Sequence, residues 1–308
     1  MGEAFEKAKS YSDEKLEKLR ARLSSHVPEN SIAIAFGSYA RREASSQSDI
    51  DYIVVGPTTD SSPGWMADVE NAISAVVSIE PSPNGAFAKY VDRCDMLKNL
   101  GGAHETNETL TRRLLLLLEG EWLSNDLEFG KFRRELLERY VRATPRDHQL
   151  SLFLLNDIIR YWRTMTVDYM YKTTEDGKPW AIRNIKLVFS RKLMYASGLF
   201  SVGMTVDRSE ERKIEELDKL FSMPVIERMI AICGSARLSK AIACYELFLE
   251  RMENPEIRTA LKQVDPNDHE NRTFRELKNE GHNFTRELLL AFEGTFHSTH
   301  PIRRAVIF

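Results

Sequence analysis

The chain has 308 residues, of which 42% are hydrophobic and 29% are charged, and its formal net charge is −3. This composition is that of an ordinary globular protein, and the length is enough for two domains. Because the overall charge is slightly negative, any site for a polyanion has to be a local basic patch. The composition therefore excludes a protein that binds nucleic acid through general basicity.

The three cysteines, Cys94, Cys233 and Cys244, are far apart in the sequence and show neither a disulfide framework nor a zinc-ligand spacing. The N-terminal segment is charged and lacks an apolar signal core. The longest leucine run, Leu114–Leu118, is far too short to cross a membrane. We therefore expect a cytoplasmic protein with no membrane insertion of its own.

Apolar spacing and turn residues predict the elements in chain order. They are a helix over 3–25, a strand–turn–helix–strand unit over 32–56, a helix over 65–80, a short strand over 86–91 and an apolar helix after Gly101-Gly102. Everything from about Phe129 onward reads as helices. The predicted class is α+β, with a small α/β domain over 1–125, a helical domain over 126–296 and a C-terminal tail over 297–308.

Two aspartates flank Ile50 at the start of the second apolar run of the 32–56 unit. Side chains alternate between the two faces of a strand, so Asp49 and Asp51 point to the same side, with their Cα atoms about 6–7 Å apart. Two carboxylates this close repel each other unless a positive charge lies between them. A divalent metal ion between the two carboxylates would remove this repulsion. Mg²⁺ prefers a few carboxylates together with water and substrate phosphates.

Gly37 and Ser38 follow the first apolar run, and ten residues separate Ser38 from Asp49. Glycine lets the backbone approach a ligand closely, and a strand-to-helix turn directs backbone N–H groups at a phosphate. Each motif is weak alone, but their order between two apolar strands is specific. Together they indicate phosphoryl-transfer chemistry, in which two metal ions act on the attacking and leaving oxygens.

This stretch resembles the DNA polymerase β-like nucleotidyltransferase superfamily, whose signature is Gly-Ser, a helix and Asp-x-Asp on the next strand. Gly37, Ser38, Asp49 and Asp51 match it, and Arg41 falls where many members carry a basic residue. The resemblance implies a mixed sheet, two Mg²⁺ or Mn²⁺ ions held by the aspartates, and a nucleotide whose β- and γ-phosphates lie at Gly37 and Ser38. The helical second half also fits the layout of the superfamily.

The resemblance also implies a third carboxylate, and several residues are candidates for it. Glu105 follows a Gly-Gly pair in a polar segment and is the one we favour. Glu119 closes the leucine run and is expected to be a helix-end residue. The remaining candidates are Glu80, Asp92 and Asp95.

The helical half is locally basic, with eight Lys or Arg residues against four Asp or Glu residues over 151–200. Arg183, Lys186 and Ser190 fall at positions i, i+3 and i+7, which share one face of a helix. The superfamily uses a basic residue of its helical domain to contact the triphosphate, and these residues are our candidates for that role. The alternative is that the basic residues form a solvated face.

The sequence closes with "HSTHPIRRAVIF", in which apolar residues follow Arg303-Arg304. We consider two alternatives: the tail packs against the helical domain, or it enters the catalytic cleft with Phe308 as its anchor. In the second case Ser298 or Thr299 is a candidate priming hydroxyl.

With this tail included, the chain resembles the template-independent nucleotidyltransferases of a bacterial anti-phage system called Hailong. That resemblance implies synthesis of single-stranded deoxyadenylate from dNTP, initiation on a protein hydroxyl, and a membrane effector protein as partner. Two alternatives stay open: a toxin or regulator that nucleotidylates tRNA or a protein, and a non-catalytic nucleotide-binding module.

Overall fold

The computed structural model describes residues 2–57, 63–79, 87, 89–142, 149–266, 268 and 270–307. The chain divides into two compact units. The sheet unit comprises residues 7–145 and 217–224, and the helical unit comprises residues 1–6, 146–216 and 225–308. The predicted α+β class is confirmed.

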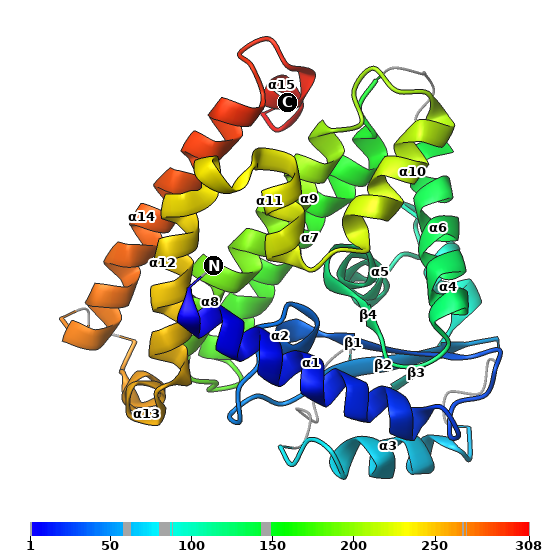
Figure 1. Cartoon of the computed structure of the whole chain (residues 1–308), viewed down its shortest axis with the longest axis horizontal. Coiled ribbons are helices and arrows are strands. Elements are labelled where there is room, and N and C mark those ends of the chain that lie inside the picture. The colour runs from blue at the N-terminus through cyan, green and yellow to red at the C-terminus, as the bar shows by residue number, and fades with distance from the viewer. Residues whose placement is uncertain are drawn as a thin grey trace. The chain divides into compact units, whose positions relative to one another are not determined.

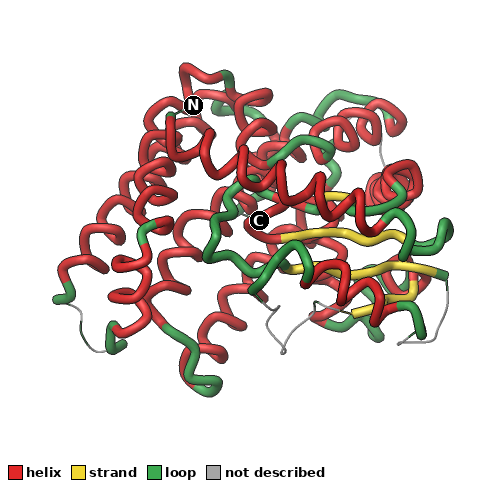
Figure 2. Tube along the Cα trace, turned by 60° about the horizontal axis from the view of Figure 1, so that its bottom comes forward, coloured by secondary structure: helices red, strands yellow, loops and turns green. Residues whose placement is uncertain are grey.

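The sheet unit contains a four-stranded sheet with the strand order β3-β2-β1-β4 (Figure 2). Its strands are β1 (Ile32–Phe36), β2 (Asp51–Gly56), β3 (Lys89–Asp92) and β4 (Glu121–Trp122). β1 pairs antiparallel with both β2 and β4, whereas β2 and β3 run parallel, so the sheet is mixed as predicted. β1 is buried along its whole length, which is why its sequence is a continuous apolar run.

The helices of the sheet unit are α1 (Glu3–Leu23, of which residues 3–6 belong to the helical unit), α2 (Gly37–Ala40), α3 (Met66–Ser74), α4 (Arg93–Leu97), α5 (Asn107–Glu119) and α6 (Asp126–Arg142). α1 has glutamates in its first turn and arginines in its last turn, which complements the helix dipole. α5 begins after Thr106, whose side-chain oxygen accepts a hydrogen bond from the Thr109 amide.

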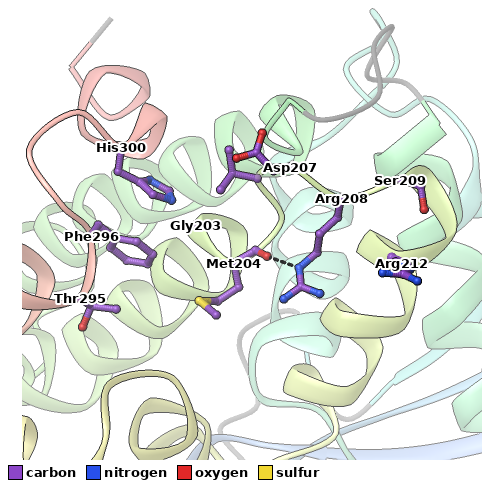
Figure 3. A pocket seen from close by; sticks show the side chains of 10 residues that line it. Gly203, Met204, Asp207, Arg208, Ser209, Arg212, Thr295, Phe296 and His300 are labelled. Carbon is purple, nitrogen blue, oxygen red and sulfur yellow. Dashed lines mark hydrogen bonds between the residues drawn. The ribbon is translucent and has the colours of Figure 1, made fainter.

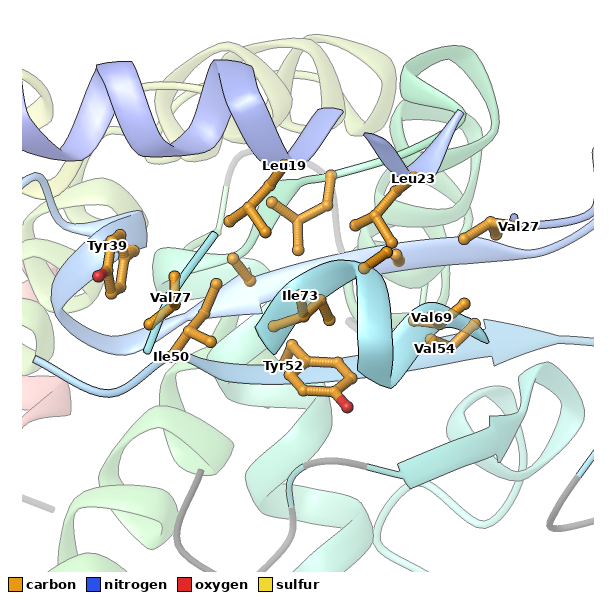
Figure 4. Packing of buried hydrophobic residues seen from close by; sticks show 14 of the residues in the cluster. Leu19, Leu23, Val27, Tyr39, Ile50, Tyr52, Val54, Val69, Ile73 and Val77 are labelled. Carbon is orange, nitrogen blue, oxygen red and sulfur yellow. The ribbon is translucent and has the colours of Figure 1, made fainter. Parts of the chain in front are cut away.

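One face of the sheet packs on α1 and α3 (Figure 4). Leu19 of α1 and Ile73 of α3 belong to one buried cluster with Ile50, Tyr52 and Val54. Because side chains alternate along β2, Asp51 at its start is directed to the opposite face from Tyr52 and Val54 of this cluster. The packing of β2 therefore fixes the side of the sheet on which the Asp51 carboxylate lies, while Asp49 precedes the strand.

The helical unit consists of α7 (Leu152–Thr174), α8 (Trp180–Lys186), the π-helical turn η1 (Leu187–Arg191), α9 (Lys192–Gly203), α11 (Val225–Cys233), α12 (Ser235–Glu253), α13 (Pro255–Gln263), α14 (Arg272–Thr295) and α15 (Pro301–Ala305). α10 (Glu210–Phe221) is divided between the two units after residue 216. α12 and α14 lie side by side (Figure 1). A Cβ atom on Gly281 of α14 would lie 2.4 Å from Val188 Cγ1, so α14 also packs closely on η1.

Several predicted boundaries differ from the structure. α6 lies in the sheet unit, so the division comes after it and not at residue 125. The helix predicted over 65–80 is the shorter α3, and the predicted strand over 86–91 is described as β3 from Lys89. β4 was not predicted, because two residues are too few to give a periodic pattern.

None of the helices in the described ranges is long and apolar enough to cross a membrane. All three cysteines are free; Cys94 is exposed, and Cys233 and Cys244 are buried.

Candidate active site

Asp51 and Gly37 lie against each other at one end of the β1–β2 pair. Asp51 is the register partner of Phe36, the residue before Gly37. Gly37 has a φ of +69°, and a Cβ atom there would lie 2.8 Å from Asp51 Oδ2. The position therefore requires glycine for both its backbone conformation and the closeness of the carboxylate.

Asp49 precedes β2 and, like Asp51, is partly exposed, whereas Ile50 between them is fully buried. The Tyr39 hydroxyl donates to the carbonyl oxygen of Ser48 at 3.4 Å. Burial raises the pKa of Tyr39, and the nearby Tyr11 and the Asp49 charge raise it further. Tyr39 therefore stays a neutral donor that fixes the backbone just before the two aspartates.

Glu119, at the C-terminal end of α5, accepts hydrogen bonds from two parts of the glycine–serine segment. Its Oε1 accepts from the Gly37 amide at 2.9 Å, and its Oε2 accepts from the Arg41 guanidinium at 2.5 Å. β4 explains the placement, because Glu121 is paired with Ala35, which brings Glu119 level with Gly37. The sequence offered Glu119 as one of the possible third carboxylates and favoured a helix-end residue, since no local pattern reveals a contact over this distance along the chain.

These bonds change the roles expected of Gly37 and Arg41. The Gly37 amide was expected to face a phosphate, but it donates to Glu119 instead. Arg41, expected to contact the nucleotide, is paired with Glu119 and with Glu43, where Nε lies 3.0 Å from Oε2. The physical reason is that Glu119 is only 6% exposed, and a buried carboxylate needs donors around it.

Ser38 is the part of the turn that remains available to a ligand. Its side chain is partly exposed, and its hydroxyl makes no hydrogen bond with the residues that the structure describes. Its carbonyl oxygen accepts from the Glu43 amide at 2.7 Å, which holds the turn in place.

Glu105, the favoured third acid, lies at the other end of α5 from Glu119. It forms a buried ion pair with Arg113, whose side chain is 0% exposed. The 13 residues of α5 rise by about 18 Å from first to last, which separates Glu105 from the Gly37 contact. Glu105 therefore neutralises a buried arginine, and its geometry does not support a place beside the two aspartates.

The other candidates for a third acid do not complete the set either. Asp92 is the register partner of Gly56, at the opposite end of β2 from Asp51, and it caps α4 by accepting from the Cys94 amide. Asp95 is exposed on α4, and Glu80 lies outside the described residues. Over the described ranges, no group of three or more His, Cys, Asp or Glu side chains is placed to hold a metal ion.

The two aspartates fit Mg²⁺ or Mn²⁺ by the chemistry of their donors. Both are carboxylates and both are partly exposed. Mg²⁺ binds through one or two carboxylates and completes its octahedron with water and substrate phosphates. Asp49 and Asp51 are therefore the residues that would hold such an ion.

The predicted shared face of Arg183, Lys186 and Ser190 is interrupted by η1. A π-helical turn contains more residues than an α-helical turn, so it rotates the residues that follow it relative to those before it. Ser190 lies within η1 and is 3% exposed, whereas Arg183 and Lys186 at the end of α8 are partly exposed. Ser190 therefore does not continue a regular α-helical face with Arg183 and Lys186, and its contact with a nucleotide stays a prediction.

Two partly buried lysines of the helical unit, which the sequence did not single out, donate to neutral side chains. Lys192 Nζ donates to Thr285 Oγ1 at 2.7 Å, and Lys278 Nζ donates to Asn184 Oδ1 at 2.6 Å. Burial lowers the pKa of Lys192, and the neighbouring Lys278 charge lowers it further; burial also lowers the pKa of Lys278. In the described part of the chain their hydrogen-bond acceptors are neutral oxygens, so we call Lys192 and Lys278 the lysine pair.

The described part of the tail packs on the helical unit, which corresponds to the first of the two alternatives. Ile302 of α15 is 0% exposed, and Arg303 Nε donates to the Phe296 carbonyl at 2.9 Å. Ser298 and Thr299 are exposed, and Thr299 Oγ1 lies 2.9 Å from His297 Nδ1. The predicted anchor, Phe308, lies outside the described residues.

Residues 16–93 match the family model described as a nucleotidyltransferase domain. The matched segment contains β1, α2, β2 and β3, and with them Gly37, Ser38, Asp49 and Asp51. A comparison with curated proteins finds no match to this chain. The domain match supports nucleotidyl transfer as the type of reaction and leaves the substrate and the acceptor open.

We expect Gly37→Ala to damage the site through its contact with Asp51. The positive φ costs a non-glycine residue about 1–2 kcal/mol, and the new Cβ atom has to displace the Asp51 carboxylate. Nucleotide incorporation should fall by more than about tenfold, since small misplacements of catalytic groups have large effects. The control is Gly177→Ala, where φ is +60° and a Cβ atom would meet nothing within 4 Å. Equal activity of the two variants would contradict a role for the Gly37–Asp51 contact.

Proposed function

We propose that the chain transfers a nucleotidyl group from a nucleoside or deoxynucleoside triphosphate to a hydroxyl, with release of pyrophosphate. The observation that carries the proposal is the position of Asp49 and Asp51 at the start of β2, with Asp51 against Gly37, inside the segment that matches a nucleotidyltransferase domain. Catalysis of this reaction consists mainly of positioning and charge stabilisation.

In this proposal Asp49 and Asp51 hold Mg²⁺ or Mn²⁺, two ions when substrate is bound. When bound, such ions supply Lewis-acid stabilisation of the phosphoryl oxygens. The Ser38 hydroxyl binds a phosphate oxygen of the nucleotide. Glu119 acts as a positioning residue, because its carboxylate accepts hydrogen bonds from the Gly37 amide and from the Arg41 guanidinium.

The phosphate contacts predicted from the sequence for residues of the helical unit stay part of the proposal. Arg183 and Lys186 stay candidates from the sequence, with Ser190 less favoured because it is buried. The lysine pair supports a further contact, since two neighbouring, partly buried ammonium groups repel each other until an anion lies between them. A phosphate gains most from charged donors that are already partly desolvated.

The double variant Lys192→Gln/Lys278→Gln separates a binding role from a scaffold role. If the lysine pair binds phosphate, the apparent KM for nucleotide should rise by at least about a hundredfold, because two contacts are lost and each is worth roughly 1.5–3 kcal/mol. The midpoint of thermal unfolding without nucleotide should not fall, since the substitution removes a repulsion between two like charges. Lys240→Gln, an exposed lysine on α12, is the control. An unchanged KM together with a lower unfolding midpoint would assign the lysine pair to the scaffold.

At a finer level we propose template-independent synthesis of single-stranded deoxyadenylate in anti-phage defence, primed on a protein hydroxyl and acting with a membrane effector protein. The support is the Hailong resemblance in the sequence. Thr299 is the better candidate for priming than Ser298, because its exposed hydroxyl is hydrogen-bonded to the His297 imidazole. A neighbouring base of this kind activates a hydroxyl nucleophile.

The experiment is an incubation of the full chain with dATP and Mg²⁺, analysed by intact-protein mass and by a denaturing gel. A ladder of deoxyadenylate covalently joined to the protein supports priming on the chain itself. Free chains without an adduct, or transfer of one nucleotide to added tRNA or protein only, would replace the finer proposal with a conventional or a regulatory nucleotidyltransferase.

A further inference from the structure

A cavity of about 600 Å³ opens in the helical unit between the end of α9, the start of α10 and the segment that joins α14 to α15. In Figure 3, Phe296 and His300 lie on one side of it, and Arg208 and Arg212 lie on the other. Cavities of this size are typical of small-molecule sites. None of its lining residues belongs to the proposed catalytic site or to the lysine pair.

The arginines give the cavity a surplus of positive charge. Arg208 Nε donates to the Met204 carbonyl at 2.7 Å, which fixes the guanidinium, and one of its terminal nitrogens lies 3.5 Å from Glu216. Arg212 forms no ion pair or hydrogen bond with any residue that the structure describes. The only acid among the lining residues is Asp207, which is exposed.

The start of α10 supplies further N–H donors beside the arginines, and its first turn also carries the exposed Glu210 and Glu211. Ser209 lines the cavity directly before the first residue of this 12-residue helix. The first N–H groups of a helix have no acceptor within the helix, and its N-terminal end carries a partial positive charge. Arg212 lies in the first turn of α10, so its guanidinium and the first N–H groups of α10 can contact the same anion.

His300 supplies an independent sign of a ligand. It is 7% exposed, and its Nδ1 accepts a hydrogen bond from the Ile302 amide at 3.2 Å. The ring proton is therefore on Nε2, which has no hydrogen-bond partner over the described residues. The ring is largely buried, but Nε2 itself is accessible from the cavity, so a polar ligand or water can accept its hydrogen bond.

We propose that this cavity binds an organic phosphate monoester. The phosphate lies between Arg208, Arg212 and the start of α10, where two guanidinium groups and a helix N-terminus match its charge and its oxygens. The organic part lies against Phe296 and Met204 and accepts a hydrogen bond from His300 Nε2. The site lies outside the segment that matches the nucleotidyltransferase domain, so the proposal stands whether or not that domain transfers nucleotides.

The test is calorimetric titration of the full chain with phenyl phosphate in the presence of EDTA, which removes the divalent ions that the catalytic site would need. We expect one binding site per chain with a dissociation constant below about 1 mM, and no binding of phenol at the same concentration. Arg212→Gln should weaken binding by about tenfold or more, because one charge-assisted contact is lost. His300→Asn should also weaken it, since asparagine keeps the capping role at the start of α15 but lacks the Nε2 donor.

The matched control is Arg304→Gln, which removes an exposed arginine of α15 that does not line the cavity. Arg304→Gln and Asp51→Asn should both bind phenyl phosphate as tightly as the unaltered chain. Absence of binding at 10 mM phenyl phosphate would overturn the proposal. Equal affinity of the unaltered chain, Arg212→Gln and His300→Asn would overturn it as well.

Discussion

Asp51→Asn is expected to reduce nucleotide incorporation by at least about a hundredfold while leaving the fold intact. Asparagine has nearly the same shape, so it fits beside Gly37, but it removes the negative charge that would hold a divalent ion. Loss of a single electrostatic contact to the reacting groups commonly costs about 10²–10³ in rate. The measurement is incorporation of labelled nucleotide with saturating Mg²⁺, alongside thermal unfolding of both proteins.

Asp92→Asn is the matched control for that experiment. Asp92 lies at the opposite end of β2 from Asp51, and asparagine caps a helix as well as aspartate does. We expect activity and stability close to those of the unaltered chain. Activity of Asp51→Asn within tenfold of the unaltered chain would remove the basis for the metal site.

Glu105→Ala is expected to lower the free energy of unfolding by about 3–5 kcal/mol. The substitution leaves the Arg113 guanidinium, with its 0% exposed side chain, without its carboxylate partner. An unpaired buried charge is expensive, and the remaining bonds of Arg113 to the Tyr140 hydroxyl and the Met96 carbonyl are to neutral groups. Chemical denaturation followed by fluorescence measures the loss.

Two further variants separate this structural role from a catalytic one. Glu108→Ala removes an exposed partner of Arg112 on the same helix and should cost less than about 1 kcal/mol. Glu105→Gln keeps hydrogen-bonding capacity toward Arg113, so enough folded protein should remain to measure its activity. Activity per folded molecule should then be close to normal. A loss of more than about a hundredfold would instead make Glu105 the third carboxylate.

The strands and the turn near the aspartates were predictable, because each depends on residues close together in the sequence. The run from Ile32 to Phe36 is continuously apolar, as expected for a strand buried on both faces. The period of two in β2 predicted that Asp49 and Asp51 share a side. The cluster formed by Ile50, Tyr52 and Val54 is consistent with that prediction.

The contacts that decide individual roles were not predictable, because they join residues far apart in the chain. Glu119 reaches Gly37 only because β4 pairs with β1, and β4 has too few residues to show a pattern. The polar sequence around Glu105 predicted a residue that faces the cleft. In the structure Glu105 forms an ion pair with the buried Arg113. The π-helical turn over 187–191 likewise has no signal in a spacing pattern that assumes regular α-helix.

One measurement tests nucleotidyl transfer by the aspartate pair most directly. The full chain is incubated with each of the eight common ribo- and deoxyribonucleoside triphosphates and Mg²⁺, and released pyrophosphate is counted against nucleotide incorporated. We predict that at least one nucleotide gives one pyrophosphate per residue incorporated, and that Asp51→Asn gives neither. If no nucleotide is consumed with Mg²⁺ or Mn²⁺, or if Asp51→Asn consumes it equally fast, the reaction is not carried out by these aspartates.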